Sequence, residues 1–458
     1  MMKIDKPSIP NGTRDFGPEK MLKRQFIIDA IKRVFEKYGF LPIETPAMEN
    51  LSVLTGKYGE EGDQLLYKIL NSGDFLSNLT SDDINQGSKS LAFRIAEKGL
   101  RYDLTVPFAR FVVMNQHEIA FPFKRYQIQP VWRADRPQRG RYREFYQCDA
   151  DVVGTDSLLS EAEIILMINE VFHYLGIPSF TIKINSRKIL KALTEVIGAP
   201  GKETTLCIAI DKIDKIGKEK VIDELLANGF SHSAITQLDP ILNAKGSNLN
   251  KFQLLESILQ NSPDGMMGLG ELKHVFEYLG HFGLTEHHAE IDLTLARGLS
   301  YYTGIIIEVK PNVSSITSSI SGGGRYDNLT GVFGLPGISG VGISFGVDRI
   351  YDVMEELKLF PLTSRSSTKV MLANFDIISS QHAIGILTKL RRAGVKSELY
   401  PDATKLKKQM TYANKKGIPF VLMVGENEIK NQQYLLKNME TGEQETLALD
   451  DIIKKLSD

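Results

Sequence analysis

Polar and apolar side chains alternate along the stretch from Phe123 to Gly154. The odd positions 125, 127, 129 and 133 are polar and the even positions are mostly apolar, and the same parity resumes between Tyr146 and Val152. A repeat of two is that of a β-strand with one face on a core. We therefore predict two strands on either side of the loop ADRPQRGRYR, with polar faces that form one surface. The residues of that surface are Arg125, Gln127, Gln129, Arg133, Gln147, Asp149 and Asp151.

The loop between these strands is rich in positive charge. Seven basic residues and a single acid, Asp135, lie between Lys124 and Arg143, although the whole chain has a formal net charge of -1. A local excess of this kind suits a phosphate-rich ligand. A basic hairpin can equally be a solvated tip. Because the polar residues fall on one side of the presumed strands, the pattern favours a binding surface.

Helical and extended patterns precede this stretch. Apolar residues at helical spacing predict a helix over 26–38, and FLPIETPAMEN predicts a short extended segment broken by two prolines. The polar segment 71–90 is expected to be a surface loop. In RYDLTVP the residues Arg101, Asp103 and Thr105 alternate, which predicts a strand edge from which the three side chains point the same way.

The composition changes between residues 186 and 285. This segment is rich in Lys, Glu, Leu and Ile and has repeated short turns, so we expect a helical insertion. It ends near His281, His287 and His288. No cysteine or matching carboxylate spacing accompanies these histidines, and we interpret them as surface residues rather than metal ligands.

Two glycine clusters each end on an arginine. Glycines 322, 323 and 324 precede Arg325, and glycines 340, 342 and 346 precede Arg349. Glycine is common in turns and in tightly packed strands as well. At a strand or helix boundary, however, such clusters let the backbone lie close to a flat ligand, with Arg349 stacking on a base or pairing with phosphate.

Strand and helix patterns alternate after the presumed linker TSRSST. The alternation over residues 369–458 predicts βαβ units with a mostly parallel sheet. A stretch of this length is in the usual range of a single domain. We therefore predict a separate C-terminal α/β domain.

Bulk composition narrows the class of protein. The chain has 458 residues, 42% of them hydrophobic and 24% charged, as expected for two to four globular domains. The near-neutral net charge of the chain argues against a protein that coats DNA without sequence preference. The two cysteines, Cys148 and Cys207, suit a reducing compartment. Since no run of about 18 apolar residues occurs, we expect no membrane span and a cytoplasmic protein.

Six segments together resemble one enzyme family. FLPIETPAM, VWRADRPQRGRYREFYQCDAD and GVGISFGVDRI resemble the three motifs of class II aminoacyl-tRNA synthetases, in the right order. LARGLSYYTG and SGGGRYDNL are similar to the two segments peculiar to histidyl-tRNA synthetases, and PNGTRDFGP resembles the N-terminal motif of that family. The resemblance to this family covers essentially the whole chain. The wording of DLTVPFAR and FYQCDADVVG is closer to its eukaryotic-type branch.

The resemblance implies an α+β fold. The class II synthetase catalytic domain is an antiparallel sheet flanked by helices, here interrupted by the helical insertion and followed by an α/β anticodon-binding domain. The implied boundaries are 1–185 and 286–362 for the catalytic domain, 186–285 for the insertion, 363–368 for the linker and 369–458 for the anticodon-binding domain. The first motif implies a homodimer.

The resemblance also implies the reaction and its cations. Histidine and ATP form histidyl-adenylate and pyrophosphate, and the histidyl group then passes to tRNA(His); Mg²⁺ accompanies ATP as a hard cation with few protein ligands. Arg133, Arg297 and Arg349 are the implied catalytic residues, because fixed cations stabilise the charge that accumulates on the α-phosphate. ATP is expected to contact Arg133, Asp135, Arg141 and Arg349.

Substrate selection is assigned by the same resemblance. Asp103, Thr105 and Gln147 match the positions that hold the α-amino group, and Asp151 and Tyr302 those that recognise the ring. The complete implied histidine site is Asp103, Thr105, Gln147, Asp151, Arg297, Tyr301 and Tyr302. The implied contacts to the tRNA acceptor end are Arg136, Gln138 and Arg139.

Two positions depart from the family pattern. Ser300 stands where the family usually has Asp, and Asp348 where Glu is common before the arginine of the third motif. Two rivals remain: a non-catalytic paralogue that regulates histidine biosynthesis or senses tRNA, and a class II synthetase for proline or threonine. The first is disfavoured because Arg133, Arg297, Arg349 and the C-terminal domain are all present, and the second by LARGLSYYTG.

Overall fold

The chain forms two compact units in a computed structural model. The structure describes residues 6–77, 79–85, 87–138, 140–284, 288–296, 301–361 and 366–457. One unit consists of the chain up to Arg14 together with Ile27–Leu359, and the other of Asp15–Phe26 together with the chain from Phe360 onward. The long helix α1 (Pro18–Lys37) is therefore divided at Phe26: its first turns belong to the second unit, and the rest of the helix belongs to the first.

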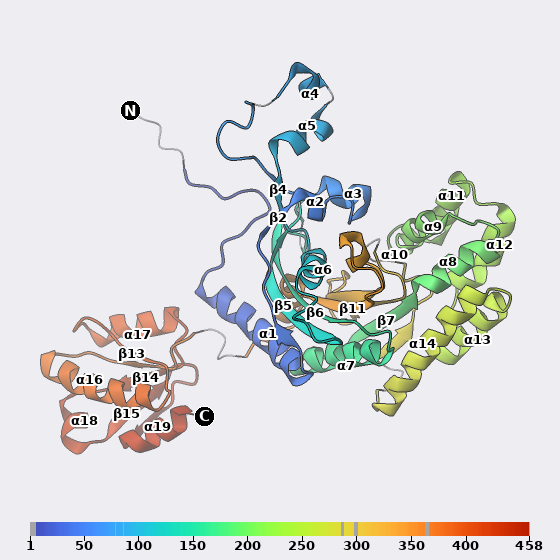
Figure 1. The fold of residues 1–458 in the computed structure, drawn as a ribbon. Coiled ribbons are helices and arrows are strands. Elements are labelled where there is room, and N and C mark those ends of the chain that lie inside the picture. Colours follow the sequence, from blue (N-terminus) through green and yellow to red (C-terminus); the bar gives the residue numbers. More distant parts are fainter. Residues whose placement is uncertain are drawn as a thin grey trace. The chain divides into compact units, whose positions relative to one another are not determined.

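An eight-stranded sheet organises the first unit (Figure 1). Its strand order is β1-β5-β6-β11-β10-β9-β7-β8, and all neighbouring pairs are antiparallel except β1 with β5 and β7 with β8. The strands are β1 (Leu41–Pro42), β5 (Phe123–Trp132), β6 (Glu144–Val153), β7 (Phe180–Ser186), β8 (Ala289–Ile291), β9 (Ile305–Pro311), β10 (Ser321–Tyr326) and β11 (Gly340–Gly346). The predicted pair of strands around the basic loop is confirmed as β5 and β6.

Helices cover the apolar face of this sheet. Phe35 on α1 and Phe172 on α7 (Leu159–Tyr174) both pack on Phe345 of β11, with ring centroids 5.8 Å and 5.6 Å apart. All three rings are fully buried. The helix α15 (Val347–Glu356) follows β11 directly and packs beside β6 and β11. With its apolar face covered, the sheet is left with its polar face to bind a ligand.

A smaller sheet lies beside the end of the large one. Its order is β2-β4-β3, formed by β2 (Met48–Asn50), β4 (Lys98–Leu100) and β3 (Lys68–Ile69). The helices around it are α2 (Leu51–Leu54), α3 (Gly59–Gln64), α4 (Ser81–Asn85), α5 (Ser88–Ile95) and α6 (Thr105–Met114). The prediction of a loop over 71–90 is therefore wrong in part, because α4 and the start of α5 lie within it.

The predicted strand edge at Arg101, Asp103 and Thr105 is also wrong. The strand β4 ends at Leu100, and Thr105 already begins α6. Asp103 lies just before that helix and its carboxylate accepts the backbone N–H of Val106 at 3.1 Å. Backbone N–H groups in the first turn of a helix lack intrahelical partners, and a short acidic side chain satisfies them. The local hydrogen bond therefore favours the start of a helix over an extended strand at this position.

The range expected to form a helical insertion consists of helices between β7 and β8 (Figure 1). They are α8 (Arg187–Val196), α9 (Glu203–Ile210), α10 (Ile213–Ile216), α11 (Lys218–Ala227), α12 (His232–Leu242), α13 (Asn248–Leu259) and α14 (Pro263–His281). Of the three histidines that end this range, His287 lies outside the described residues. A 3-10 helix, η1 (Thr330–Phe333), joins β10 to β11.

The second unit contains a five-stranded sheet of order β13-β12-β14-β15-β16. The strands are β12 (Val370–Leu372), β13 (Ser397–Leu399), β14 (Phe420–Met423), β15 (Tyr434–Asn438) and β16 (Gln444–Leu447). The helices are α16 (Ile377–Arg392), α17 (Leu406–Lys415), α18 (Glu426–Asn431) and α19 (Leu449–Ser457). β12 pairs in parallel with β13 and β14, as predicted, whereas β15 and β16 are antiparallel additions.

The α+β class is thus confirmed, with an antiparallel catalytic-type sheet and a C-terminal α/β unit. Among the helices that the structure describes, none is both long and apolar enough to cross a membrane.

Candidate active site

A buried polar layer occupies the open face of the large sheet. The register places Asp149 opposite Gln127 on β5 and Ser344 on β11, and Asp151 opposite Arg125 and Gly342. Arg125 and Gln127 are fully buried. The polar surface predicted from parity therefore exists, but at these positions it lies within the protein. Gly342 is required in this layer, because a Cβ there would collide with the Asp151 carboxylate.

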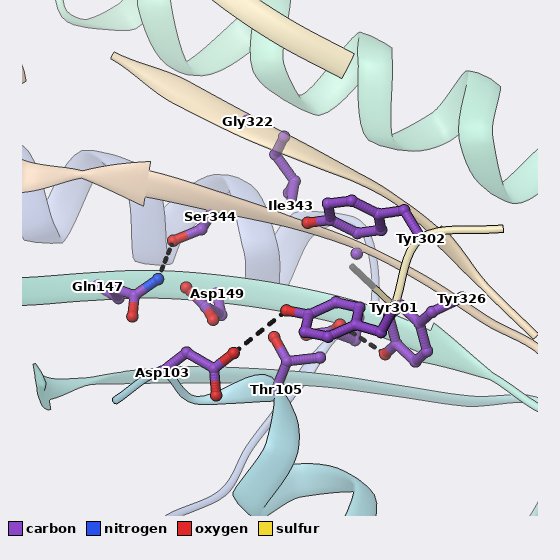
Figure 2. A pocket seen from close by; sticks show the side chains of 12 residues that line it. Asp103, Thr105, Gln147, Asp149, Tyr301, Tyr302, Gly322, Tyr326, Ile343 and Ser344 are labelled. Carbon is purple, nitrogen blue, oxygen red and sulfur yellow. Dashed lines mark hydrogen bonds between the residues drawn. The ribbon is translucent and has the colours of Figure 1, made fainter. Parts of the chain in front are cut away.

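A cavity of about 120 Å³ opens on this polar layer (Figure 2). It is lined by Asp103, Thr105, Gln147, Asp149, Asp151, Tyr301, Tyr302, Gly322, Tyr326, Gly342, Ile343 and Ser344. All the described residues that were assigned to histidine by resemblance are among them. Arg297, the remaining one, lies outside the described residues, as does Ser300.

Asp103 is held by three donors. Its carboxylate accepts the hydroxyls of Tyr58 at 3.0 Å and Tyr301 at 3.2 Å, in addition to the backbone N–H of Val106. Burial raises the pKa of Asp103 above its ordinary value, and these hydrogen bonds oppose the shift. Tyr58 is far from the other site residues in sequence and carries no motif, so no sequence signal identified it.

Asp151 is held by a cation and a hydroxyl. The Arg125 Nη2 atom lies 2.7 Å from Asp151 Oδ2, and the Tyr326 hydroxyl donates to Oδ1 at 2.6 Å. Burial raises the pKa of Asp151, while Arg125 lowers it. The Arg125 guanidinium also lies 4.1 Å from the ring centroid of Phe108. Arg125 therefore fixes Asp151 without itself lining the cavity.

Replacing Tyr326 with phenylalanine should raise the KM for the substrate that fills the cavity about tenfold or more, with a smaller change in kcat. The lost bond is donated to a carboxylate, and such bonds contribute about 1.5–3 kcal/mol. Steady-state kinetics with the amino acid that the resemblance implies measure the effect. Tyr434→Phe in the other unit is the matched control, since Tyr434 bonds to His382 there. An unchanged KM in Tyr326→Phe would contradict the role of the hydroxyl.

Asp149 is a cavity residue that the sequence reasoning did not assign to the site. Its parity placed it on the polar face, which was the available signal. It is only 2% exposed and its Oδ1 atom has no hydrogen-bond partner in the described part of the chain. Burial raises the pKa of Asp149 to about 7, with Asp151 adding to the shift and Arg125 opposing it. This carboxyl is therefore half-ionised near neutral pH.

Asp149→Asn should stabilise the protein at pH 8. The pKa of the Asp149 carboxyl is about 7 in the folded state and near 3.8 in the unfolded state. The contribution of this carboxyl to the free energy of unfolding is therefore fully present at low pH and is lost as the pH rises from about 4 to about 7. The pKa shift limits the gain in unfolding free energy at pH 8 to about 4 kcal/mol. Burying an asparagine amide costs part of that gain, which leaves about 2 kcal/mol. Urea unfolding at pH 8 and pH 4 measures the change in unfolding free energy, which should turn into a loss of about 2 kcal/mol at pH 4, where only the cost of the buried amide remains. An equal gain at both values would contradict the linkage.

A cleft of about 1480 Å³ adjoins the cavity. Gln147, Tyr302, Gly322 and Ser344 line both spaces. The cleft is also lined by all four residues assigned to ATP, namely Arg133, Asp135, Arg141 and Arg349. An amino acid in the cavity and a nucleotide in the cleft would thus meet at a shared boundary.

Backbone carbonyls orient Arg133 and Arg349, the two described arginines that the resemblance assigns to catalysis. Arg133 Nε donates to the Tyr102 carbonyl at 3.0 Å, and its guanidinium lies 4.2 Å from the Tyr102 ring centroid. Arg349 donates to the carbonyls of Gly140 at 3.1 Å and Ser319 at 2.7 Å. Both side chains are only partly buried. Guanidinium groups at the border of a cleft can bind phosphate oxygens, because each carries several N–H donors in a fixed plane.

The N-terminal motif braces the loop and the third motif. Arg143 donates its backbone N–H to Gly12 O at 2.9 Å, and Arg14 binds the carboxylate of Asp348 at 2.6 Å. The Arg14 guanidinium also lies 3.2 Å from the ring centroid of Tyr142. Asp348, which departs from the family pattern and lies within the described residues, is thus positioned by Arg14.

The loop residues assigned to tRNA lie apart from the cavity. Arg136 and Gln138 are exposed and line neither the cavity nor the cleft. Gln138 and Arg141 exchange backbone hydrogen bonds of 3.1 Å and 2.9 Å, which close the loop into a tight turn. Arg139 lies outside the described residues.

Comparison with known proteins identifies the family of the chain. A family model described as histidyl-tRNA synthetase matches residues 12–350, and one described as an anticodon binding domain matches residues 369–458. The chain belongs to the histidyl-tRNA synthetase family. Membership excludes the rival reading as a class II enzyme for proline or threonine.

Curated members of the family match the chain over its full length. The histidine–tRNA ligase of Cytophaga hutchinsonii is 60% identical over 99% of this chain and all of its own, and that of Bacteroides fragilis is 54% identical over 99% of both. These relatives are bacterial, so they give the eukaryotic-type assignment no support.

Solved structures of histidyl-tRNA synthetases share the fold. The crystal structure from Nostoc sp. PCC 7120 has a TM-score of 0.84 and 31% identity, and covers 99% of each chain. A Bacillus halodurans structure titled ATP phosphoribosyltransferase regulatory subunit/histidyl-tRNA synthetase has a TM-score of 0.72 at 22% identity, which shows the fold alone.

Proposed function

We propose that this chain is a histidine–tRNA ligase. It activates histidine with ATP to histidyl-adenylate and pyrophosphate, and then transfers the histidyl group to tRNA(His). The observation that carries the proposal is the junction of a small carboxylate-lined cavity with an arginine-lined cleft. The names of full-length relatives at 54–60% identity support the same reaction.

The cavity residues bind histidine in this proposal. Asp103, with Thr105 and Gln147, holds the α-ammonium group, and Asp151 with Tyr302 recognises the ring. Asp103 and Asp151 are both buried, at 1% and 2% exposure. A buried carboxylate that an isosteric amino acid left unpaired would cost enough free energy to reject that amino acid.

The arginines of the cleft act on ATP. Arg133 and Arg297 stabilise the negative charge that develops as the histidine carboxylate attacks the α-phosphate, and Arg349 binds the γ-phosphate and packs on the adenine. Asp135 and Arg141 assist from the loop, where their charged groups lie 3.7 Å apart. Fixed cations supply positioning and electrostatic stabilisation, which is what a phosphoryl centre needs.

Mg²⁺ fits the donor set of the cleft. No cluster of three or more His, Cys, Asp or Glu suited to a metal occurs among the described residues, whereas single carboxylates such as Asp135 and Glu308 do line the cleft. Mg²⁺ prefers one or two carboxylates together with substrate phosphates and water. When bound with ATP it neutralises phosphate charge, and Asp135 and Glu308 are the residues we assign to hold it.

Transfer places tRNA against the basic loop. Arg136, Gln138 and Arg139 would meet the acceptor end, and the unit that matches the anticodon-binding family would bind the anticodon. We further propose a cytoplasmic homodimer. The first motif exposes two large apolar side chains, Leu41 at 60% and Met48 at 55%, which a second copy of the chain would cover.

Histidine-dependent exchange of radioactive pyrophosphate into ATP tests the proposal. The purified chain should catalyse exchange with histidine and not with proline or threonine. Exchange needs no tRNA, so it isolates the activation step. Absence of exchange with histidine from folded protein would refute the ligase proposal and favour the non-catalytic paralogue.

A further inference from the structure

Asp149 lies at the centre of the polar layer. Gln127 and Ser344 flank it across the sheet, and Gln147 and Asp151 flank it along β6. Figure 2 shows its side chain in the cavity between Gln147 and the hydroxyl of Tyr301. A group in this place touches any ligand that fills the cavity.

The cavity has more negative than positive charge. Asp103, Asp149 and Asp151 all line it, while Arg125 is the buried cation beside them within the described residues. Asp103 has its three donors, and Asp151 has Arg125 and Tyr326. Asp149 has a hydrogen bond with Ser344, but its Oδ1 has no hydrogen-bond partner and no paired cation within the described residues. The titratable and charged groups that face it are Arg125, Asp103, Asp151 and the hydroxyl of Tyr302.

The spacing of Asp149 and Asp151 suits a particular ligand. They are two residues apart on one strand, so their side chains leave the same face about 6.5–7 Å apart. Both are pure acceptors when ionised. A neutral imidazole has one N–H donor and one acceptor nitrogen, whereas an imidazolium has two donors. Two neighbouring carboxylates therefore complement the charged ring better than the neutral one.

We propose that Asp149 is a specificity-determining residue of the histidine cavity, which binds the substrate ring as an imidazolium with one ring N–H directed to Asp149 and the other to Asp151. The inference rests on the proposed function. Above neutral pH the neutral ring gains one proton from solvent as it binds; near neutral pH a protonated Asp149 passes its proton to the ring. In either case one N–H bond forms on the ring and one O–H bond of the Asp149 carboxyl or of solvent breaks, so a single proton is transferred.

The proton is available near neutral pH. Burial brings the pKa of Asp149 to about 7, and the pKa of a histidine side chain is about 6.5. Once paired, each charge favours the ionised form of the other. Neutral isosteres such as asparagine and glutamine cannot supply this charge, so they would leave Asp149 buried and unpaired.

The state of the bound ring tests the proposal directly. The ¹⁵N shifts of ring-labelled histidine, bound to the wild-type chain at pH 8, should be those of an imidazolium. Calorimetry in buffers of different ionisation enthalpy should count uptake of about one proton on binding. Between pH 7.5 and 8.5 the histidine Kd should rise about tenfold, because one proton is taken up per ligand.

Asp149→Asn should remove these signatures. Its bound ring should be neutral, proton uptake should fall to near zero, and the Kd should become almost independent of pH in this window. Asp223→Asn, which changes an exposed carboxyl on α11, is the matched control and should behave as wild type. Circular dichroism and unfolding curves establish that the variants are folded.

Failure of this inference is distinguishable from failure of the proposed function. A neutral ring in the wild-type complex, or an imidazolium retained in Asp149→Asn, would overturn the inference while histidine-dependent pyrophosphate exchange persisted. Loss of that exchange in the wild-type chain would instead overturn the function. The wild-type ring state decides the matter even when Asp149→Asn does not fold.

Discussion

Replacing Arg297 with alanine is expected to lower kcat for histidine activation about 100- to 1000-fold, on the order of the loss of one oxyanion donor. Negative charge accumulates on the α-phosphate in the transition state and repels the incoming carboxylate. A fixed guanidinium across the two groups stabilises that state more than the bound substrates. The KM for histidine should therefore change much less than kcat.

The chain connectivity supports this role for Arg297. Ala296 lines the cleft and Tyr301 lines the cavity, and Arg297 follows Ala296 directly in the sequence. Pyrophosphate exchange and steady-state kinetics give kcat and KM separately. Arg392→Ala, an exposed arginine of the other unit, is the matched control and should leave exchange unchanged. Preserved turnover with weakened histidine binding would show that Arg297 only binds.

Arg125→Met should destabilise the catalytic unit by about 3–5 kcal/mol and greatly weaken histidine binding. The guanidinium is fully buried and lies 2.7 Å from the Asp151 carboxylate. Removing one partner of a buried ion pair leaves the other charge uncompensated, which costs about that much. Asp149 and Asp103 would add to the repulsion. Urea unfolding of the variant measures the change.

A double-mutant cycle separates charge from packing at this position. Asp151→Asn in the Arg125→Met background should recover part of the lost stability, because the unpaired charge is then gone. Arg125→Lys keeps the charge and should be less destabilising than Arg125→Met, although lysine cannot reproduce the planar contact with Phe108. Equal losses in all the variants would show that the pair contributes nothing.

Some of the site followed directly from local pattern. The parity of residues 123–154 predicted β5 and β6 and the shared direction of Arg125, Gln127, Gln147 and Asp151. Strand periodicity is a local property, since successive side chains must alternate between faces. The same reasoning failed at Asp103. There the Val106 N–H donates to the Asp103 carboxylate at the start of a helix, so the alternation of polar residues in RYDLTVP does not correspond to a strand.

Other features depended on contacts between distant segments. Tyr58 reaches Asp103 across 45 residues, and Tyr326 reaches Asp151 across 175. Asp149 carried the right parity, but its importance comes from burial beside two other carboxylates. Burial, and the pKa shift that follows from it, is produced by the surrounding fold rather than by neighbours in sequence.

By itself the sequence determined the strands around the basic loop, the α+β class, the alternating C-terminal unit and, through its motifs, the family. These depend on periodicity and on short segments, which any local stretch of chain carries. Only the tertiary structure decided that the polar face is a buried layer, that Arg125 pairs with Asp151, and that Oδ1 of Asp149 has no hydrogen-bond partner within the described residues. Charges from two strands and the segment before α6 meet at one small cavity, and their mutual energies exist only once the fold has brought them together and excluded water.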